Sequence, residues 1–395
     1  MTKRKPSLAN IRDCTGCMAC VASCCVSALT KNMGEDGHVY VKWDAGKCIA
    51  CMRCEEVCKV VHSLSGTERL NLSTPYAAWA KDEALRQRST SGGFAAAAGR
   101  WFIKNGSGVA GASFDGRMAR HILAADGNSL SAIQGSKYVW SDAGPVYHEI
   151  AALLPQKKVL FTGTGCQVAG VLAFFANHPF RDNLYTIDLI CGGVPSDLLM
   201  QSFFASNPQL EAIISFRSKR KYELKGIVSG QEFVFPDNAL PLAGFRSEQT
   251  MRFSCYNCQY ACAHRASDIT IGDLWGNAAP IRELTHGVSL VVVHTDKGRE
   301  LLSCAEVYAH PIAWKDLLTN NGRLVFGCTP LTFLRKRLAR NFQRMDVHEF
   351  ERVYSLTSSI DRPAEFLFRI WLHLLRKVYT FKCQRTVKSI LNQCE

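Results

Sequence analysis

The sequence predicts an α+β protein of several domains: a cysteine-dense N-terminal segment, an α/β core and a basic helical tail. Three observations lead to this prediction. The chain has 395 residues, and single cores rarely keep growing beyond about 300 residues. Cysteines follow a duplicated spacing before residue 62, and from residue 91 short strand-like apolar runs alternate with helical ones. We therefore expect domains at residues 1–62 and 63–330, followed by a C-terminal region at 331–395.

The composition is that of a folded protein with reduced thiols. Apolar residues make up 47% and charged residues 21% of the chain, which excludes extensive disorder. The basic start is not followed by an apolar run, so we expect no secretory signal and a cytoplasmic location. The 18 cysteines should then be available as metal ligands. No apolar stretch approaches the length of about 18 residues that a membrane-spanning helix needs.

The charge balance does not require a nucleic-acid partner. The net charge is +13, from 47 basic and 34 acidic residues, and such a balance can mark a nucleic-acid-binding surface. However, residues 331–395 hold 13 basic and 6 acidic residues, so they contribute +7 of the +13. The rest of the chain is nearly balanced. We therefore expect no nucleic acid as a partner.

The N-terminal cysteines carry the strongest signal. Two groups share one spacing, with intervals of two, two and three residues: Cys14, Cys17, Cys20 and Cys24, then Cys48, Cys51, Cys54 and Cys58. Three cysteines at this spacing can surround one face of a cubane, and the fourth ligates the neighbouring cluster. The first 4Fe-4S cluster would then take Cys58 and the second would take Cys24. Zinc is the alternative, but structural zinc sites use separated pairs of ligands. The segment resembles a bacterial-type dicluster ferredoxin, which transfers single electrons.

Periodicity outlines the core. A polar connection is expected at about residues 62–90, followed by a helix at 94–104 and another at about 168–175. Strands are expected at residues 158–161, 184–190, 213–216, 226–235, 268–271 and 289–294.

Two turns of the core favour a bound ligand. Ser91-Gly92-Gly93 opens a helix, where backbone amides and the helix N-terminus attract a phosphate, although an ordinary helix start has the same pattern. The glycine-rich turn from Gly163 to Gln167 follows a strand, and ligands of open α/β sheets collect at such carboxyl ends. Lys137-Tyr138 adds a cation and an aromatic ring, or else an exposed lysine beside a packed tyrosine.

A third group of cysteines lies downstream. Cys255, Cys258 and Cys262 are spaced by two and three residues and need a fourth ligand from elsewhere. Cys166 and Cys191 both follow expected strands. We expect a third 4Fe-4S cluster on Cys166 and the triplet, with Cys191 as the alternative fourth ligand and zinc as the alternative metal.

Several motifs in order resemble one family, the beta subunits of coenzyme F420 hydrogenases and dehydrogenases, over about residues 70–302. The motifs are Ser91-Gly92-Gly93, Lys137-Tyr138, Gly163–Gln167, Asp188–Ser196, Phe216–Lys219, the cysteine triplet, Gly272–Gly276 and Gly287–Leu290. The family binds FAD and an iron–sulfur cluster, and some members carry a fused ferredoxin. By this resemblance, the flavin contacts would be Ser91, Gly92, Gly93, Lys137, Tyr138, Ser141, Thr164 and Gln167.

The resemblance implies an oxidoreductase that passes electrons between a hydride carrier, FAD and the clusters, with a redox protein or a hydride-carrying coenzyme as partner. Bacterial members accompany surface-polysaccharide synthesis. Gly192 stands where the family commonly has histidine, so the substrate side differs. No catalytic side chain is identified, since Asp188 and Asp273 more often have structural roles. The alternative function is a non-catalytic electron-transfer subunit.

The C-terminal tail predicts an amphipathic helix. Between residues 365 and 388, apolar residues such as Trp371 and Leu374 alternate with Arg369, His373 and Arg376 on another face. Such a helix can lie on an anionic membrane, which makes peripheral contact with the inner face of the membrane one hypothesis. The alternative is a helix docked on the protein's own core.

Overall fold

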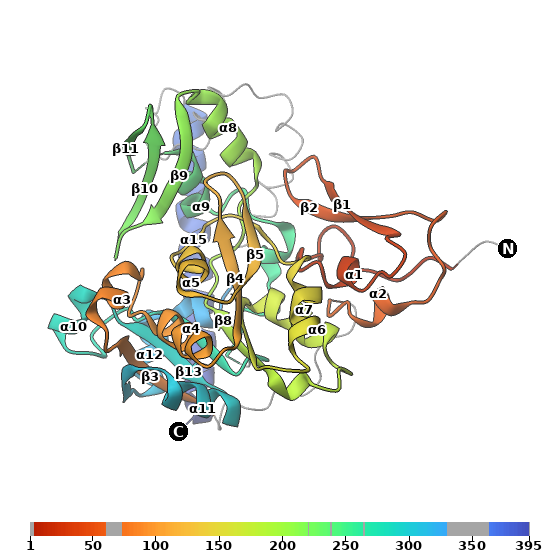
Figure 1. Cartoon of the computed structure of the whole chain (residues 1–395). Helices are drawn as coiled ribbons and strands as arrows, with labels where there is room; N and C mark the ends of the chain where they lie inside the picture. Colours follow the sequence, from red (N-terminus) through yellow and green to blue (C-terminus); the bar gives the residue numbers. More distant parts are fainter. Residues whose placement is uncertain are drawn as a thin grey trace.

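The computed structural model describes residues 4–60, 73–219, 221–237, 239–263, 265–329 and 363–394. A nine-stranded mixed sheet forms the centre, with the strand order β14-β3-β13-β12-β8-β7-β4-β5-β6. Its strands are β3 (Thr74–Ala80), β4 (Gly108–Phe114), β5 (Ala119–Ala124), β6 (Ser141–Asp142), β7 (Val159–Thr164), β8 (Leu184–Leu189), β12 (Ile269–Asp273), β13 (Ser289–Val293) and β14 (Val307–Pro311). This mixed architecture confirms the expected α+β class (Figure 1).

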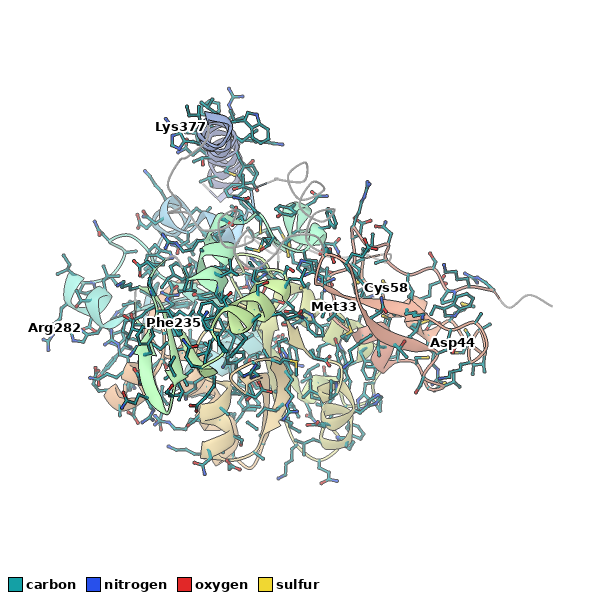
Figure 2. The ribbon with its side chains drawn as sticks, turned by 90° about the horizontal axis from the view of Figure 1, so that it is seen from above. Met33, Asp44, Cys58, Phe235, Arg282 and Lys377 are labelled. Atoms are coloured by element: carbon teal, nitrogen blue, oxygen red, sulfur yellow. The ribbon has the colours of Figure 1, made fainter. Side chains whose placement is uncertain are left out.

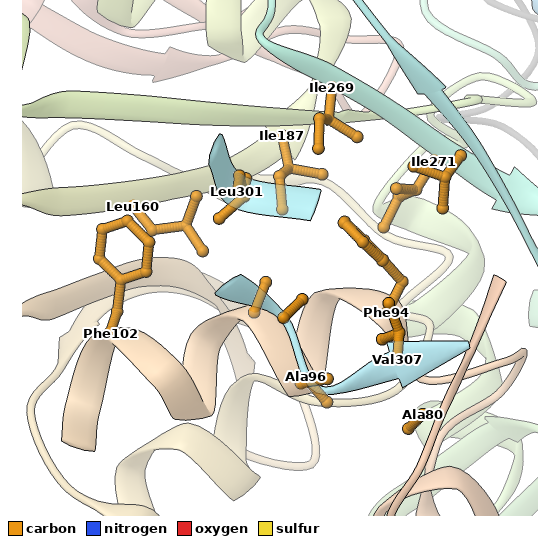
Figure 3. Packing of buried hydrophobic residues seen from close by; sticks show 14 of the residues in the cluster. Ala80, Phe94, Ala96, Phe102, Leu160, Ile187, Ile269, Ile271, Leu301 and Val307 are labelled. Carbon is orange, nitrogen blue, oxygen red and sulfur yellow. The ribbon is translucent and has the colours of Figure 1, made fainter. Parts of the chain in front are cut away.

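Helices cover both faces of the sheet. They are α3 (Glu83–Arg88), α4 (Phe94–Lys104), α5 (Gly127–Ile133), α6 (Val146–Leu153), α7 (Gly165–Phe174), α10 (Ile281–His286), α11 (Asp296–Cys304) and α12 (Trp314–Asn320), whereas α8 (Leu198–Ser206) and α9 (Leu240–Ser247) pack with a smaller second sheet. On one face, Phe94 and Phe102 of α4 pack against Leu160 and Ile187 (Figure 3). On the other face, α6 and α7 pack against Phe161. Alternate residues of β7 thus enter different cores, which explains its continuous apolar run.

A small second sheet contains β9 (Leu210–Arg217), β10 (Tyr222–Val228) and β11 (Gln231–Val234) in the order β11-β10-β9. The expected single strand at residues 226–235 is wrong, because a turn divides it. Ser229 and Gly230 have φ values of 50° and 77°, and Val228 pairs with Gln231. Two consecutive left-handed residues make the tight hairpin turn whose twist matches that of the strands.

The expected polar connection at residues 62–90 is also wrong where the structure describes it. Strand β3 pairs with β13 and β14 inside the large sheet, and α3 follows it. Residues 61–72 lie outside the described part of the chain. Small buried side chains, Ala77, Ala78 and Ala80, occupy both faces of β3, so the strand lacks the alternation that would reveal it in the sequence.

The N-terminal segment forms a separate lobe against the sheet domain (Figure 1). It contains α1 (Ala19–Ala22), a hairpin of β1 (Leu29–Met33) and β2 (Val39–Trp43), and α2 (Arg53–Glu56). We call residues 4–60 the cysteine block. The two cysteine motifs fold alike, because Gly16 and Met18 of the first and Ala50 and Met52 of the second all have positive φ angles.

Backbone and side-chain hydrogen bonds join the cysteine block to the core. Tyr147 Oη donates to the carbonyl of Cys17 over 2.9 Å, and Trp140 Nε1 donates to the carbonyl of Gly16 over 3.2 Å. Ser196 Oγ donates to the carbonyl of Asp36 over 2.8 Å. Because these bonds come from distant parts of the core, they hold the block in one orientation.

The tail helix α15 spans Pro363–Cys394 and lies at the edge of the molecule in Figure 2, which labels Lys377 on it. Leu375, Cys383 and Val387, spaced at four- and eight-residue intervals, face the protein. Trp371 and Phe381 are exposed. None of the helices in the described ranges is both long and apolar enough to cross a membrane. The expected tail residues 331–362 lie outside those ranges.

Candidate functional site

The first expected ligand set lies around one cavity. A cavity of about 330 Å³ is lined by Cys14, Cys17, Cys20 and Cys58. The thiols of Cys14, Cys17 and Cys58 all interact electrostatically with that of Cys20. Cys58 therefore joins the first triplet in space, although it belongs to the second motif in sequence. Burial raises the pKa of Cys17 to about 11, so this thiol stays protonated until a metal replaces its proton.

The second expected set lies farther out. The thiol of Cys54 interacts electrostatically with those of Cys24 and Cys51, so the two motifs exchange their fourth cysteines here as well. Backbone amides donate to sulfur in this set: Ala28 N to Cys24 Sγ over 3.2 Å, and Ala50 N to Cys48 Sγ over 3.4 Å. Such donors stabilise a negatively charged thiolate. Cys51 is exposed, which brings this set to the protein surface.

A second cavity, of about 240 Å³, lies at the carboxyl ends of β7 and β8. These strands are parallel neighbours, so Cys166 after β7 and Cys191 after β8 meet at one edge of the sheet. The cavity is lined by the thiol-bearing residues Cys166, Cys191, Cys255, Cys258 and Cys328. Cys262, an expected ligand, does not line it. The thiol of Cys166 interacts electrostatically with those of Cys191, Cys255 and Cys258.

Hydrogen bonds distinguish the five cysteines. Cys191 Sγ accepts a bond from Gly193 N over 3.3 Å, as a thiolate ligand can. Cys328 Sγ instead donates to the carbonyl of Gly192 over 2.9 Å, which requires a protonated thiol. Burial raises the pKa of Cys255 to about 12. Cys166, Cys191, Cys255 and Cys258 are thus the lining cysteines without such a donated bond, and the expected ligand role of Cys262 stays a prediction.

None of the three cysteine sets has the geometry of a site for a single metal ion. Across the described ranges, no three Cys, His, Asp or Glu side chains are grouped closely enough to hold one metal ion. The described cysteines up to Cys383 form no disulfide bonds with one another. Cubane ligands stand farther apart than the ligands of one ion, because four irons and four sulfides lie between them.

The two cavities share part of their walls. Thr15, Val60, Cys166 and Tyr260 line both of them. Across this boundary the packing is close, since a Cβ on Gly170 of α7 would lie 3.0 Å from Cys17 Sγ. Groups bound in the two cavities would thus be direct neighbours.

The expected flavin contacts fall into two groups, and the first surrounds the N-terminus of α4. Gly93 begins the helix with φ 86°. A Cβ on Gly92 would lie 2.4 Å from the carbonyl oxygen of Ala78, so this glycine allows the turn to approach the sheet. Ser91 Oγ donates to the carbonyl of Val288 over 2.9 Å. Lys219 Nζ donates to the carbonyl of Ser91 over 3.5 Å, which brings a cation to the turn.

Lys137 and Tyr138 lie next to this turn. Thr90 Oγ1 is 3.2 Å from Ser136 Oγ, the residue before Lys137. The Lys137 amine donates to the carbonyl of Gln134 over 2.5 Å, and burial lowers its pKa to about 8. Tyr138 stacks on Phe245, with ring centroids 4.3 Å apart. These residues therefore present amines and aromatic rings beside a helix N-terminus, a combination that suits a phosphate-bearing aromatic cofactor.

The second group is internally paired. Gln167 Nε2 donates to the carbonyl of Ser141 over 3.1 Å, and its Oε1 accepts from Thr164 N over 3.0 Å, which caps α7. Ser141 Oγ is 2.9 Å from His121 Nδ1. These contacts position the turn that carries Cys166. A direct role of the second group in binding flavin stays a prediction.

Several residues beside the first group were not among the expected flavin contacts. Arg217 forms an ion pair with Asp273 over 2.5 Å, and its guanidinium lies 5.9 Å from the ring centroid of Trp275. Phe216 to Lys219 was a motif of the resemblance, but its place beside Tyr138 depends on tertiary contacts. Phe245 carries no signal in the sequence.

The two acids considered for catalysis are paired. Asp188 is buried and accepts from Arg265 Nη1 over 2.8 Å and from Ser267 Oγ over 2.9 Å. Asp273 pairs with Arg217. Both carboxylates therefore have structural partners.

Comparison with known proteins finds a family match over part of the chain. Residues 156–310 match the family described as the C terminus of the coenzyme F420 hydrogenase/dehydrogenase beta subunit. No curated protein matches the chain. A chain of the F420-reducing NiFe hydrogenase complex from Methanosarcina barkeri is 18% identical, with a TM-score of 0.45, over 71% of this chain and 90% of that chain. The matched region runs from β7 into β14 and includes Cys166, Cys191, Cys255 and Cys258 of the core cavity, so residues 156–310 confirm the expected resemblance to the coenzyme F420 hydrogenase/dehydrogenase beta subunits over this part of the chain.

Proposed function

We propose that this protein is an iron–sulfur flavoprotein oxidoreductase. It passes electrons between a hydride carrier, FAD and three 4Fe-4S clusters. The outer cluster would use Cys24, Cys48, Cys51 and Cys54, the inner cluster Cys14, Cys17, Cys20 and Cys58, and the core cluster Cys166, Cys191, Cys255 and Cys258. The family relationship supports a redox role, since the family is named for hydrogenases and dehydrogenases.

One observation carries the proposal: the inner and core cavities share Thr15, Val60, Cys166 and Tyr260 as wall residues. Two cysteine-lined cavities in direct contact form a path for electrons between the block and the core. A zinc protein would gain nothing from this contact, because zinc has no redox chemistry. The exposure of Cys51 supports the outer set as the place where a one-electron partner protein exchanges electrons.

The flavin would bind beside the N-terminus of α4. Its phosphates would meet the backbone amides of Gly92 and Gly93 and the amines of Lys137 and Lys219, which have no carboxylate among their hydrogen-bond partners in the described ranges. Tyr138 would support an aromatic ring. When bound, FAD supplies the conversion between hydride transfer and single-electron transfer. The protein's own residues hold it, exclude water and orient it toward the core cavity.

The alternative is a non-catalytic electron-transfer subunit that feeds a partner enzyme. Gly192 favours this alternative, because the family's histidine is missing from the turn after Cys191. Both functions use the clusters, but only the first needs the flavin and a hydride donor such as coenzyme F420.

Anaerobic purification with counts of iron, sulfide and released flavin tests the proposal. About twelve irons and one FAD per chain are expected for three clusters and one flavin. About eight irons without flavin would support the electron-transfer subunit and refute the oxidoreductase. Reduction of the purified protein by F420H₂, NADH or NADPH, followed by the loss of flavin absorbance, would then identify the hydride carrier.

We also propose that α15 makes peripheral contact with an anionic membrane. The face of the helix that is turned away from the protein exposes Trp371, Val378 and Phe381. Between Ile370 and Lys388 the helix contains no acidic residue, and its charged side chains are all basic. An apolar stripe with basic residues beside it suits the interface of an anionic bilayer. Binding of the whole protein to vesicles with and without anionic lipid tests this contact.

A further inference from the structure

Arg252 is the largest side chain that is completely buried among the described residues, with 0% of its surface exposed. It lies between the cysteine block and the core. Its backbone amide donates to the carbonyl of Val194 over 2.9 Å, and the preceding Met251 forms a bridge with Pro195. The backbone of Arg252 is therefore fixed to the core, while its side chain points into the block.

The guanidinium binds carbonyl groups of the block. Its Nη2 donates to the carbonyl of Val39 over 2.6 Å, and its Nη1 donates to the carbonyl of Cys14 over 3.3 Å. The ring centroid of Tyr40 is 4.8 Å from its central carbon. Its Nε has no hydrogen-bond partner among the described residues. These acceptors are neutral, so they satisfy hydrogen bonds but do not balance the charge.

A buried charge without a partner is costly, because burial removes the water that would otherwise solvate it. None of the ion pairs in the described part of the chain includes Arg252, in contrast to Arg265 and Arg86, which pair with Asp188 and Glu283. One carboxylate, Asp197, interacts with it electrostatically without forming an ion pair. A further source of negative charge should therefore act on this guanidinium.

Two cysteines on opposite sides of Arg252 can provide that charge. Arg252 contacts Cys14 of the inner cavity through its guanidinium, and its backbone carbonyl accepts a hydrogen bond from the amide of Cys255 of the core cavity over 2.9 Å, so its charge acts on both thiols. The approach to the inner cavity depends on Gly16, since a Cβ there would lie 2.8 Å from Nη2 and 3.0 Å from the central carbon of the guanidinium. The block thus leaves room for this cation directly beside its first ligand loop.

We propose that Arg252 is a positioning residue that compensates the negative charge of the inner and core clusters together and raises the reduction potentials of both. This inference rests on the proposed function, because it requires the clusters. One-electron reduction adds a negative charge to a cluster, and a buried cation close by stabilises the reduced form. The effect is strong in an interior of low dielectric constant. The outer cluster, whose ligands belong to the far side of the block, should be unaffected.

Three variants of the full-length protein, purified anaerobically, test the inference. Arg252→Met removes the charge, Arg252→Lys keeps it, and Ser254→Ala is the matched control. Ser254 Oγ donates to the same Cys14 carbonyl over 3.1 Å, so its loss weakens the same contact without changing the charge. Iron is counted first, and the potentials are then measured by redox titration with dithionite, followed by electron paramagnetic resonance.

We expect Arg252→Met to lower the potentials of two clusters and to leave the third unchanged. Arg252→Lys and Ser254→Ala should keep potentials close to those of the wild type. Unchanged potentials in an Arg252→Met protein with full iron content would overturn the inference. If this variant does not fold, Arg252→Lys decides, because potentials that fall although the charge is kept would also overturn it. A wild-type protein without clusters would instead refute the proposed function, which is a separate result.

Discussion

Replacement of Cys191 by alanine should remove the core cluster and leave the two clusters of the cysteine block in place. Cys191 lines the core cavity together with Cys166, Cys255 and Cys258. Its sulfur accepts a hydrogen bond from Gly193 N over 3.3 Å, which supports a thiolate at this position. Alanine cannot ligate iron, and three thiolates leave one corner of the cubane without a ligand. The iron content should therefore fall from about twelve to about eight per chain.

The assay is the count of iron and sulfide after anaerobic purification, with electron paramagnetic resonance of the reduced protein to identify the lost signal. Two cysteine variants are matched controls. Cys262→Ala should keep about twelve irons, because Cys262 does not line the cavity. Cys328→Ala should also keep them, because Cys328 Sγ donates to the carbonyl of Gly192 and is therefore a protonated thiol. The reasoning would be refuted if Cys262→Ala lost four irons while Cys191→Ala kept all of them.

Three further predictions concern the flavin, the tail and a buried histidine. Lys219→Met should weaken FAD binding by roughly tenfold or more, since a charge-assisted hydrogen bond contributes about 1.5–3 kcal/mol. Burial and the nearby Arg86 lower the pKa of Lys219 to about 8, so FAD affinity of the wild type should fall as the pH rises from 7 to 9. Trp371→Glu should reduce co-sedimentation with anionic vesicles without changing stability, since Trp371 is 41% exposed. Burial lowers the pKa of His121 to about 4, so the folded state favours neutral imidazole, and acid should destabilise the protein by about 2 kcal/mol between pH 7 and pH 5.

Each of these predictions has a control. Lys225→Met, which removes a surface amine paired with Glu232 over 2.9 Å, should leave FAD binding unchanged. Vesicles of neutral lipid should bind the wild type and Trp371→Glu equally weakly. For His121, denaturant unfolding is measured at both pH values, and equal free energies of unfolding would contradict the prediction. FAD affinity that is constant from pH 7 to 9 would exclude Lys219 as a phosphate ligand.

Local patterns in the sequence predicted those elements whose apolar residues follow a regular spacing. The α4 helix has the bounds expected from its apolar spacing, Phe94–Lys104, because its whole inner face packs against the sheet. Strand β3 was missed because it has small buried side chains on both faces. The hairpin of β10 and β11 was missed because the apolar residues on both sides of Ser229 and Gly230 were assigned to one strand, although Ser-Gly is a turn signal.

The candidate site likewise contains residues that local sequence patterns predict and residues that only tertiary contacts bring together. The spacing of the N-terminal cysteines was enough to group Cys58 with Cys14, and the two line one cavity. To predict which cysteines line the core cavity, the order of the strands in the sheet must be known. Cys262 is close to Cys258 in sequence, so the spacing favoured it, whereas Cys191 is 64 residues before Cys255 and reaches the cavity only because β8 lies beside β7. Sequence spacing alone carries no information about that neighbourhood.

If the clusters bind as proposed, the position of the cysteine block would determine how electrons enter and leave. The inner cavity borders the core, since Cys17 packs against Gly170 and its carbonyl accepts a hydrogen bond from Tyr147. The outer set, with Cys51 exposed, is open to a partner. A cluster there would therefore be the exchange point, and the inner cluster the fixed connection between that point and the core.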